Sequence, residues 1–390
     1  MPEWQRRQLG DLCTRLTVGH VGPMASRYKS SGIPFLRSLN IKRGRVDLSA
    51  VKYIDEKFHS ELAKSQIKPG DLAIVRTGEP GVAAIIPDTL PVANCSDLVI
   101  ATPKPDVDGR FLCYAINETA QDFVKAHTVG AVQQHFNVKS AKVLEINLPP
   151  LHTQRAISEL LGALDNKIAV NERIARKADE LSREIFQQAL LASPANFTDC
   201  ALSEAAEFIN GRAFTKDATG TGRMVIRIAE INSGPGASTV YNDIEVPDKH
   251  IARPGDVLFA WSGSLTVARW YRPEAIINQH IFKCIPRVGY PDWLVSQLLH
   301  GKIDEFRAIA AGKATTMGHI QRKHLDDPVS VPESEELVSL DRQISPLWDS
   351  ALLAERESLT LATLRDTILP QLMSGRLRVK TAEKIVEDAT

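Results

Sequence analysis

The chain has 390 residues, which is long enough for roughly two domains that each bury a core of their own. Hydrophobic residues make up 43%, charged residues 24% and aromatic residues 6%, a composition that excludes a disordered or fibrous protein. Lys plus Arg and Asp plus Glu both total 47, so net charge neither indicates nor excludes nucleic-acid binding, which depends on local clustering. The N-terminus lacks a signal-peptide core, and no run of about 18 apolar residues could span a bilayer. We therefore expect a cytoplasmic protein with no membrane contact.

Signatures of metal binding and of catalysis are missing from the sequence. The five cysteines contain no CxxC pair, the ten histidines lack metal-ligand spacing, and there is no GxxxxGK[ST], HExxH or GxSxG motif. The segment NLPPL is similar to the Asn-Pro-Pro-aromatic loop of amino-methyltransferases, but Leu148 separates Asn147 from the prolines and Leu151 is not aromatic. We expect a non-catalytic chain with reduced thiols and no metal.

The sequence repeats itself at a spacing of about 183 residues, which predicts two copies of one fold. IKPGDLAIVRTGEPG (67–81) resembles IARPGDVLFAWSGS (251–264), each a Pro-Gly-Asp turn, a short apolar strand and a loop of small residues. GAVQQHFNVKSAKVLEINLPP (130–150) parallels GKATTMGHIQRKHLDDPVSVPE (312–333), each a glycine, a polar loop, a helical turn and a strand ending at proline. Order and spacing are both kept.

Two long helices complete the repeat, because the same apolar seam occurs in both. In the first helix the seam positions alternate four and three apart, and they are Ile157, Leu161, Leu164, Ile168, Asn171, Ala175, Ala178, Ser182, Ile185 and Ala189. The positions 183 residues later are Leu340, Ile344, Leu347, Ala351, Ala354, Ser358, Leu361, Arg365, Ile368 and Leu372. A sustained period of about 3.5 residues packs best against a helix with a like period, so we expect these seams to pair.

Several residues qualify the prediction of paired helices. Asn171, Ser182 and Arg365 interrupt the seams and could fix their register, whereas Pro346 and Pro370 should each start, kink or end a helical segment. The competing interpretation is two unrelated amphipathic helices, each buried against its own domain.

These patterns predict an α+β protein of alternating globules and helices. The predicted parts are a first mixed α/β domain at 1–150, a helical spacer at 151–193, a second α/β domain at 194–333, a helical spacer at 334–378 and a fraying polar tail at 379–390. Antiparallel pairing of the spacers would relate the two domains by an approximate two-fold axis. Helices of this length span roughly 50 to 60 Å. That geometry suits two DNA-binding domains on one duplex, since half-sites one helical turn apart are separated by roughly 34 Å.

The chain resembles the specificity subunit of type I restriction-modification systems, the HsdS-like family. The resemblance rests on INLPPLHTQRAISELLGALDNKI after the first domain, on LRDTILPQLMSGRLRV near the end and on the paired PGD strands, so it covers nearly the whole chain. The second spacer opening, VSVPESEELVSLDRQISPLWDSA, departs from the family pattern because it lacks a second proline and the expected Gln and contains Pro346.

The resemblance implies a function and a set of partners. Each α/β domain would be a target recognition domain that reads one half of a bipartite site in double-stranded DNA. The spacers would dock two methyltransferase subunits, and restriction subunits would join the complex. The resemblance implies no cofactor in this chain, with S-adenosylmethionine bound by the methyltransferase and ATP and Mg²⁺ by the restriction subunit.

Clusters of basic and polar residues are the candidate DNA contacts. Residues 26–46 carry six cations and no acid, and the repeat-related segments 123–144 and 306–325 also lack acids. Gln and Arg side chains can bond adenine and guanine edges. The residues we expect to contact DNA are Arg37, Asn40, Lys42, Arg43, Arg45, Arg76, Gln133, Gln134, His135, Arg212, Lys216, Arg223, Trp261, Lys313, Thr315, Thr316, His319, Gln321 and Arg322. The plainer interpretation is that the basic runs are solvated loops and that Trp261 is a core residue.

Two other functions remain open from the sequence. One is a DNA-specificity subunit of another restriction-modification type, in which a single partner fuses methyltransferase and nuclease. The other is a helical adaptor with two protein-binding globules and no DNA role. Salt-dependent DNA affinity separates the adaptor from the DNA-binding alternatives, because phosphate contacts weaken as salt rises.

Overall fold

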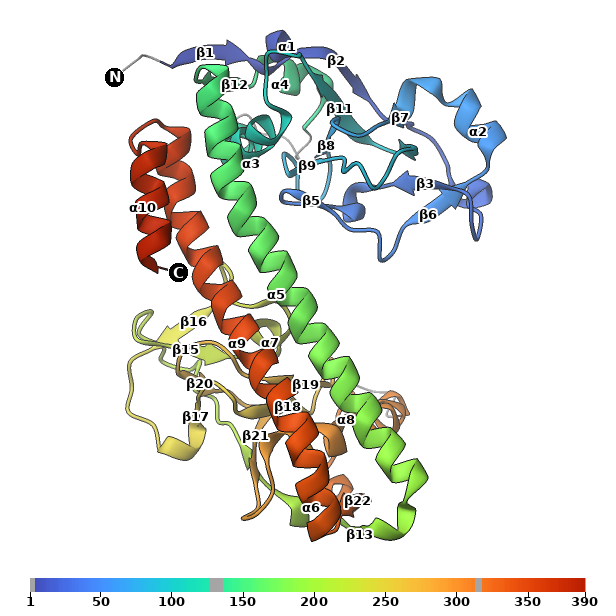
Figure 1. Ribbon diagram of the computed structural model, residues 1–390, viewed down its shortest axis with the longest axis vertical. Helices are drawn as coiled ribbons and strands as arrows, with labels where there is room; N and C mark the ends of the chain where they lie inside the picture. Colours follow the sequence, from blue (N-terminus) through green and yellow to red (C-terminus); the bar gives the residue numbers. More distant parts are fainter. Residues whose placement is uncertain (1–3, 127–135, 313–317, 390) are drawn as a thin grey trace. The chain divides into compact units, whose positions relative to one another are not determined.

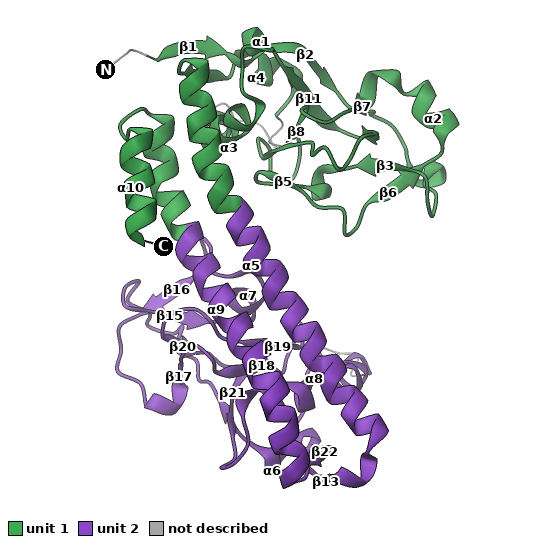
Figure 2. Ribbon diagram, viewed as in Figure 1, with its two compact units in different colours: residues 1–165, 363–390 green, residues 166–362 purple. Residues whose placement is uncertain are grey.

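The computed structural model describes residues 4–126, 136–312 and 318–389. The chain divides into two compact units, of which unit 1 contains residues 1–165 and 363–390 and unit 2 contains residues 166–362 (Figure 2). Two long helices, α5 (Leu151–Ala192) and α9 (Ser334–Met373), each contribute one segment to each unit.

The β-structure of unit 1 consists of two four-stranded sheets and two small two-stranded sheets (Figure 1). The strand orders are β6-β3-β10-β7 and β2-β11-β8-β9, while β1 pairs with β12 and β4 with β5. Strands β3 and β10 run parallel, and the other strand pairs among the described residues of this unit are antiparallel. The strands are β1 (Gln5–Gln8), β2 (Cys13–Val18), β3 (Ile33–Leu36), β4 (Ile41–Lys42), β5 (Arg45–Val46), β6 (Lys52–Ile54), β7 (Gln66–Ile67), β8 (Leu72–Val75), β9 (Ala83–Ile85), β10 (Ala93–Cys95), β11 (Leu98–Pro103) and β12 (Glu145–Leu148).

Unit 2 repeats the topology of both four-stranded sheets and of the β1-β12 pair, which confirms the predicted duplication, whereas the β4-β5 sheet has no counterpart among its described residues. Its sheets have the orders β16-β15-β20-β17 and β14-β21-β18-β19, β13 pairs with β22, and again one pair, β15 and β20, is parallel. The strands are β13 (Phe197–Ala201), β14 (Ala206–Asn210), β15 (Arg223–Ile226), β16 (Val240–Asn242), β17 (Ile251–Ala252), β18 (Val257–Ala260), β19 (Thr266–Arg269), β20 (Ala275–Ile277), β21 (Ile281–Pro286) and β22 (Pro328–Pro332).

Shorter helices occupy matching places in the two units. Helix α3 contacts β9 in unit 1, and α8 contacts β19, the equivalent strand of unit 2. The buried strand β8 contributes to the core of unit 1, and Phe259 and Phe306 stack with ring centroids 5.8 Å apart in the core of unit 2. The helix bounds are α1 (Leu9–Leu12), α2 (Glu56–Glu61), α3 (Gly109–Ala126), α4 (Val138–Val143), α6 (Leu202–Ala205), α7 (Ile228–Ser233) and α8 (Asp292–Ala311), and the equivalent of α4 is a 3₁₀-helix at Arg322–Asp326.

Helices α5 and α9 run antiparallel within each unit, as predicted. In unit 2, Ala175 and Ala178 pack against Ala351 and Ala354, with Leu347 beside them. Further along, Phe186 of α5 shares a core cluster with two earlier seam positions of α9, so residue numbers rise on one helix as they fall on the other. Alanine at these positions lets the helix axes approach closely.

The seam positions are the buried faces of both helices. The structure buries Ile157, Leu161, Leu164, Ala351, Leu361 and Ile368 and leaves Ile168 and Leu347 partly buried. Asn171 donates from Nδ2 to Glu357 Oε2 at 2.7 Å in unit 2, and Arg365 Nη1 pairs with Asp165 Oδ1 at 2.7 Å in unit 1.

Neither proline starts or ends a helix, because α9 continues through both positions. Pro346 and Pro370 lie on the exposed face of the helix, as do Arg342 and Asp366, four residues before each. A proline removes the N–H that would bond the carbonyl four residues earlier. Because those carbonyls lie on the exposed face, water can satisfy them.

The polar tail was also predicted wrongly, since residues Val379–Ala389 form helix α10 (Figure 1). Gly375 adopts φ 70°, a left-handed conformation that suits glycine, and so reverses the chain after α9. Ala382 is fully buried, and its N–H donates to Arg378 O at 3.0 Å. Val379 and Ala382 are three residues apart and lie on one face of the helix, but two apolar positions among mostly polar residues are a weak sequence signal for a helix.

No helix within residues 4–126, 136–312 and 318–389 combines the length and apolarity needed to cross a bilayer.

Candidate nucleic-acid interface

A small basic hairpin lies against strand β9 of unit 1, where Gly44 N–H donates to Ala83 O at 2.9 Å. Strands β4 and β5 pair Lys42 with Arg45, and Gly44 makes the turn with φ 78°. Lys42, Arg43 and Arg45 are all exposed, and Arg43 Nη2 contacts Glu118 Oε2 of α3 at 3.1 Å. The hairpin therefore presents three cations on an anchored turn, which is suited to phosphate contact.

Two predicted DNA contacts in the same segment have structural roles. Asn40 is 0% exposed, accepts the N–H of Arg37 on Oδ1 at 3.0 Å and donates to Asp47 O at 2.9 Å. Arg37 is partly buried and donates to Ala50 O at 2.6 Å. Glu230 caps Arg227 in the same way in unit 2. The polar atoms of both residues hold the turn after β3. Full burial of Asn40 excludes direct DNA contact by its side chain, whereas contact by the partly buried Arg37 stays a prediction.

In unit 1 a charged pair lies at one edge of the sheet, where strand β8 ends and its neighbour β11 begins. Arg76 directly follows β8, and Asp97 directly precedes β11, the strand paired with β8. The Arg76 Nη1 atom forms an ion pair with Asp97 Oδ1. Asp97 adopts φ 49°, and its N–H donates to His20 O at 3.0 Å. The side chains of Arg76 and Asp97 remain 20% and 36% exposed, so both reach solvent.

In unit 2 the equivalent positions hold aromatic residues. Trp261 directly follows β18, and His280 directly precedes β21 with φ 72°. Their ring centroids lie 5.0 Å apart, and the Trp261 indole N–H donates to Asn210 Oδ1 at 2.9 Å. His319 contacts the same tryptophan edge-on, with centroids 6.3 Å apart. The partly buried Trp261 therefore combines a packed face with an edge near solvent.

Backbone contacts show that the two sites are equivalent. Phe136 N–H donates to Arg76 O at 3.0 Å, and Ile320 N–H donates to Trp261 O at 3.2 Å. Gly211 approaches the neighbouring strand end so closely that a Cβ there would lie 2.0 Å from Asn278 O. Gly19 occupies the matching place in unit 1, where a Cβ would lie 2.8 Å from Cys95 O. Side chains larger than glycine are excluded at both sites.

The remaining predicted contacts are distributed over both units. Arg212, Lys216, Gln321 and Arg322 are exposed. Arg223 is partly buried, with its Nε 3.8 Å from Glu274 Oε2. Six predicted residues lie outside the described residues, namely Gln133, Gln134, His135, Lys313, Thr315 and Thr316.

Several polar groups that the sequence analysis missed surround the unit 2 site. Asn278 and His250 are nearly fully buried, and Arg212 and Asn278 are joined by a parallel bridge between strand ends. Asn278 Oδ1, His280 Nδ1 and both His250 ring nitrogens are buried without a hydrogen-bond partner among the described residues. Burial, assisted by the positive charges of Arg212 and Lys249, lowers the pKa of His250. Comparing NCSDLVI with INQHIFK, the segments before β11 and β21, could have drawn attention to these positions.

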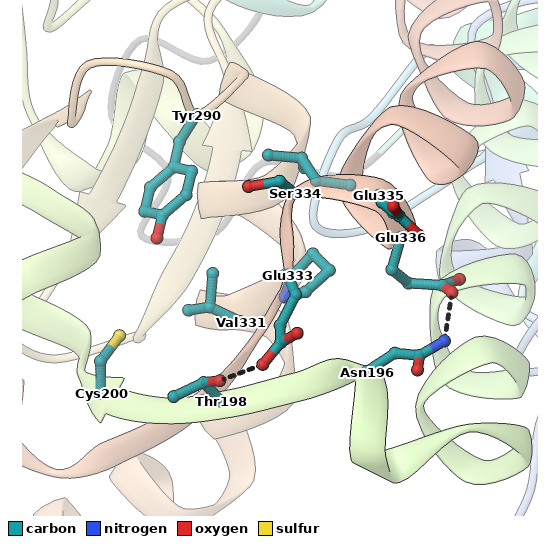
Figure 3. A pocket seen from close by; sticks show the side chains of 11 residues that line it. Asn196, Thr198, Cys200, Tyr290, Val331, Glu333, Ser334, Glu335 and Glu336 are labelled. Atoms are coloured by element: carbon teal, nitrogen blue, oxygen red, sulfur yellow. Dashed lines mark hydrogen bonds between the residues drawn. The ribbon is translucent and has the colours of Figure 1, made fainter.

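A different recess in unit 2 has the wrong charge for DNA. The pocket, of about 790 Å³, lies between β13, β22 and the start of α9 and presents Glu333, Glu335 and Glu336 (Figure 3). Thr198 Oγ1 donates to Glu333 Oε1 at 3.0 Å, and Asn196 Nδ2 donates to Glu336 Oε2 at 2.9 Å. Carboxylates repel phosphates, so this pocket does not belong to the candidate interface. Among the side chains the structure describes, no group of three His, Cys, Asp or Glu could hold a metal ion.

Comparisons with known proteins agree on one family. The family "Type I restriction modification DNA specificity domain" matches residues 1–179. The predicted type I restriction enzyme MjaX specificity subunit of Methanocaldococcus jannaschii is 27% identical over 182 residues, which are 44% of this chain and 42% of that protein. The match therefore spans less than half the length of that relative.

One solved structure extends the similarity to the whole fold. The type I restriction-modification S subunit of M. genitalium aligns with a TM-score of 0.60 at 15% identity, covering 95% of this chain and 96% of that one. The HsdS subunit of Thermoanaerobacter tengcongensis covers 97% of this chain and 98% of that one at 19% identity, with a TM-score of only 0.37. Residues 1–179 thus match the type I restriction-modification DNA specificity domain, and the chain shares its fold with the S subunit of M. genitalium over 95% of its length.

Proposed function

We propose that the protein is the sequence-specific DNA recognition subunit of a type I restriction-modification complex. The observation that carries this proposal is the duplication of one strand topology, whose first copy matches a DNA specificity domain. Each unit would read one half of a bipartite target, and the basic hairpin of unit 1 would contact phosphates. Base contacts would specify the sequence, while phosphate contacts position the protein.

The chain itself would be non-catalytic and would bind no cofactor. Two methyltransferase subunits carrying S-adenosylmethionine would modify the DNA, and restriction subunits using ATP and Mg²⁺ would join them. In such a complex, this chain would bind DNA selectively and would provide a rigid docking surface for its partners.

The basic hairpin allows a direct test of DNA binding. Replacing Lys42, Arg43 and Arg45 together with alanine should weaken binding to all duplexes alike, because phosphate contacts carry no sequence information. In titrations at several salt concentrations, the slope of log affinity against log salt should fall by as much as ~0.9 for each lost contact. The fold should survive, since the ion pair of Arg43 with Glu118 at 3.1 Å lies at the surface.

The control removes an equal charge from exposed positions elsewhere in unit 1. Arg376, Lys380 and Lys384 replaced with alanine should leave the affinity and the salt slope unchanged. If the unaltered chain bound no duplex even at low salt, the DNA function would be wrong and the adaptor alternative would be favoured. If the hairpin variant bound normally, the hairpin would lie outside the interface.

Helix α5 offers a surface for the proposed methyltransferase partner within unit 2. Val170, Ile174 and Leu181 are 38%, 40% and 45% exposed, although apolar residues are usually buried. Positions four and seven residues apart lie on the same side of a helix. The stripe therefore suits the apolar face of a partner helix, which would add a further helix beside the α5–α9 pair.

The docking surface is tested by placing charge on it. The double variant Ile174→Asp and Leu181→Asp should lose copurification with a co-expressed type I methyltransferase subunit, because docking would desolvate two carboxylates. Leu191→Asp is the matched control, since Leu191 is an even more exposed apolar residue at the end of the same helix. Retention of the methyltransferase by the double variant, with helicity unchanged by circular dichroism, would remove this stripe from the interface.

A further inference from the structure

The same backbone position carries different chemistry in the two units. We call Arg76 and Asp97 the strand-end pair of unit 1, and Trp261 and His280 the strand-end pair of unit 2. In each pair one residue directly follows a buried central strand and the other directly precedes the strand hydrogen-bonded to it. Equivalent scaffolds therefore present a charged pair in one unit and an aromatic pair in the other.

Both pairs include a residue held in an uncommon backbone conformation. Asp97 and His280 have φ values of 49° and 72°, although neither is glycine. Left-handed conformations of non-glycine residues cost free energy and are concentrated at functional sites. In both units, the residue that precedes the second strand of the pair is thus held in an uncommon backbone conformation.

Buried polar atoms without partners gather at these strand ends. The described residues contain seven such side-chain atoms, and five of them belong to Arg76, His250, Asn278 and His280. Native proteins rarely leave buried polar groups unpaired, so each such group calls for an explanation. Their concentration beside the strand-end pairs is the observation that points to a polar ligand at this edge.

We infer that the strand-end pairs contact base edges and determine the sequence of the two half-sites. This inference rests on the proposed DNA function and adds to it the residues that specify each half-site. Arg76 would read guanine, whose O6 and N7 atoms accept two hydrogen bonds from one guanidinium group. Asp97 is a positioning residue, because its ion pair with Nη1 fixes the direction of the arginine fork.

The unit 2 pair would recognise its half-site by contact with an aromatic surface. Trp261, His280 and His319 form a cluster of rings, and the indole N–H is already bonded to Asn210. Such rings stack on bases or contact the thymine methyl group. The two half-sites should consequently differ, with a guanine requirement in the half read by unit 1.

The test is selection of duplexes from a random library by the full-length chain. The unaltered protein should enrich two short sequences at a fixed separation. Arg76→Ala and Asp97→Asn should reduce the preference in one half by roughly 10-fold at one or more positions and leave the other half intact. His280→Asn and Trp261→Phe should change only the second half. Asparagine suits the left-handed backbone at both replaced positions, so the fold is kept.

The matched control is Arg6→Ala, which removes an arginine of unit 1 that also pairs with a carboxylate, Glu145, at 3.4 Å. This variant should enrich the same DNA sequences as the unaltered protein. If the strand-end variants also enriched that sequence with undiminished preference, or lost affinity for every duplex equally, the strand-end pairs would not read bases. If the unaltered chain enriched no sequence at all, the proposed DNA function itself would fail, and with it this inference.

Discussion

Asp292, the first residue of α8, shows how a single carboxyl group can reduce stability. Burial, reinforced by the negative charge of Asp256 and opposed by Lys283, raises its pKa to about 6. An unfolded Asp has a pKa of about 3.9. Because the folded value is higher, ionisation opposes folding, and this cost appears as pH rises from about 4 to about 6 and stays at higher pH.

We therefore expect Asp292→Asn to stabilise unit 2 at neutral pH. The gain in unfolding free energy at pH 7.5 should be about 1 kcal/mol, after allowance for partial solvent screening and for the lost charge at a helix N-terminus. At pH 4 that gain should vanish, because the native carboxyl group is then protonated. Urea unfolding at the two pH values measures the difference. An equal effect at both would show that burial does not perturb this group.

The role of a single side chain can be predicted where the local sequence pattern determines its environment. Asn171 and Arg365 interrupt the seams as predicted and bond across them, to Glu357 and Asp165. Ser182 looked equivalent in the sequence, yet its Oγ donates to Ala178 O of its own helix at 2.7 Å and so specifies no register. The choice between these bonds depends on the facing residue, which periodicity does not identify.

At the scale of elements, the long helices could be predicted and the sheets could not. The seam has enough regular positions to identify α5 and α9 from the sequence, even across Pro346 and Pro370. The sheets pair strands that are not consecutive, for example β2 with β11 and β14 with β21. Short apolar strands carry no information about which distant strand they will pair with.

The candidate sites depend on the same non-local pairing. His20, Arg76, Asp97 and Phe136 meet at one edge of unit 1 although about 116 residues separate the first from the last. Sequence spacing predicted Arg76 and Trp261 but not their partners Asp97 and His280. Aligning the two copies of the repeat residue by residue would have identified these partners, because Asp97 and His280 occupy equivalent positions.

Element contacts also explain how a sheet is fixed to the helices within unit 2. Arg269 of β19 is almost fully buried and pairs with Asp179 of α5 at 3.1 Å and Glu355 of α9 at 2.9 Å. Its guanidinium carbon lies 4.4 Å from the ring centroid of Trp348. One side chain therefore joins three elements. Unit 1 uses a different connection, in which Tyr114 of α3 donates to Asp165 of α5 at 2.5 Å.

At the scale of the whole molecule, the central feature is a duplicated α/β fold, each copy of which is completed by segments of two continuous helices. Neither copy is therefore a simple stretch of sequence. The copies keep the same strand order while their strand-end residues differ in chemistry. Such an arrangement lets one copy change its recognition surface without disturbing the sheets that support the other.

The most direct test of this account is exchange of one copy. Residues 197–332, from β13 to the end of β22, would be replaced by the equivalent domain of a specificity subunit with a different known target. The chimera would be co-expressed with a type I methyltransferase, and methylated sites in the host genome would be sequenced. We predict that one half of the bipartite target changes while the other half stays the same. A target altered in both halves, or in neither, would contradict independent reading by two copies.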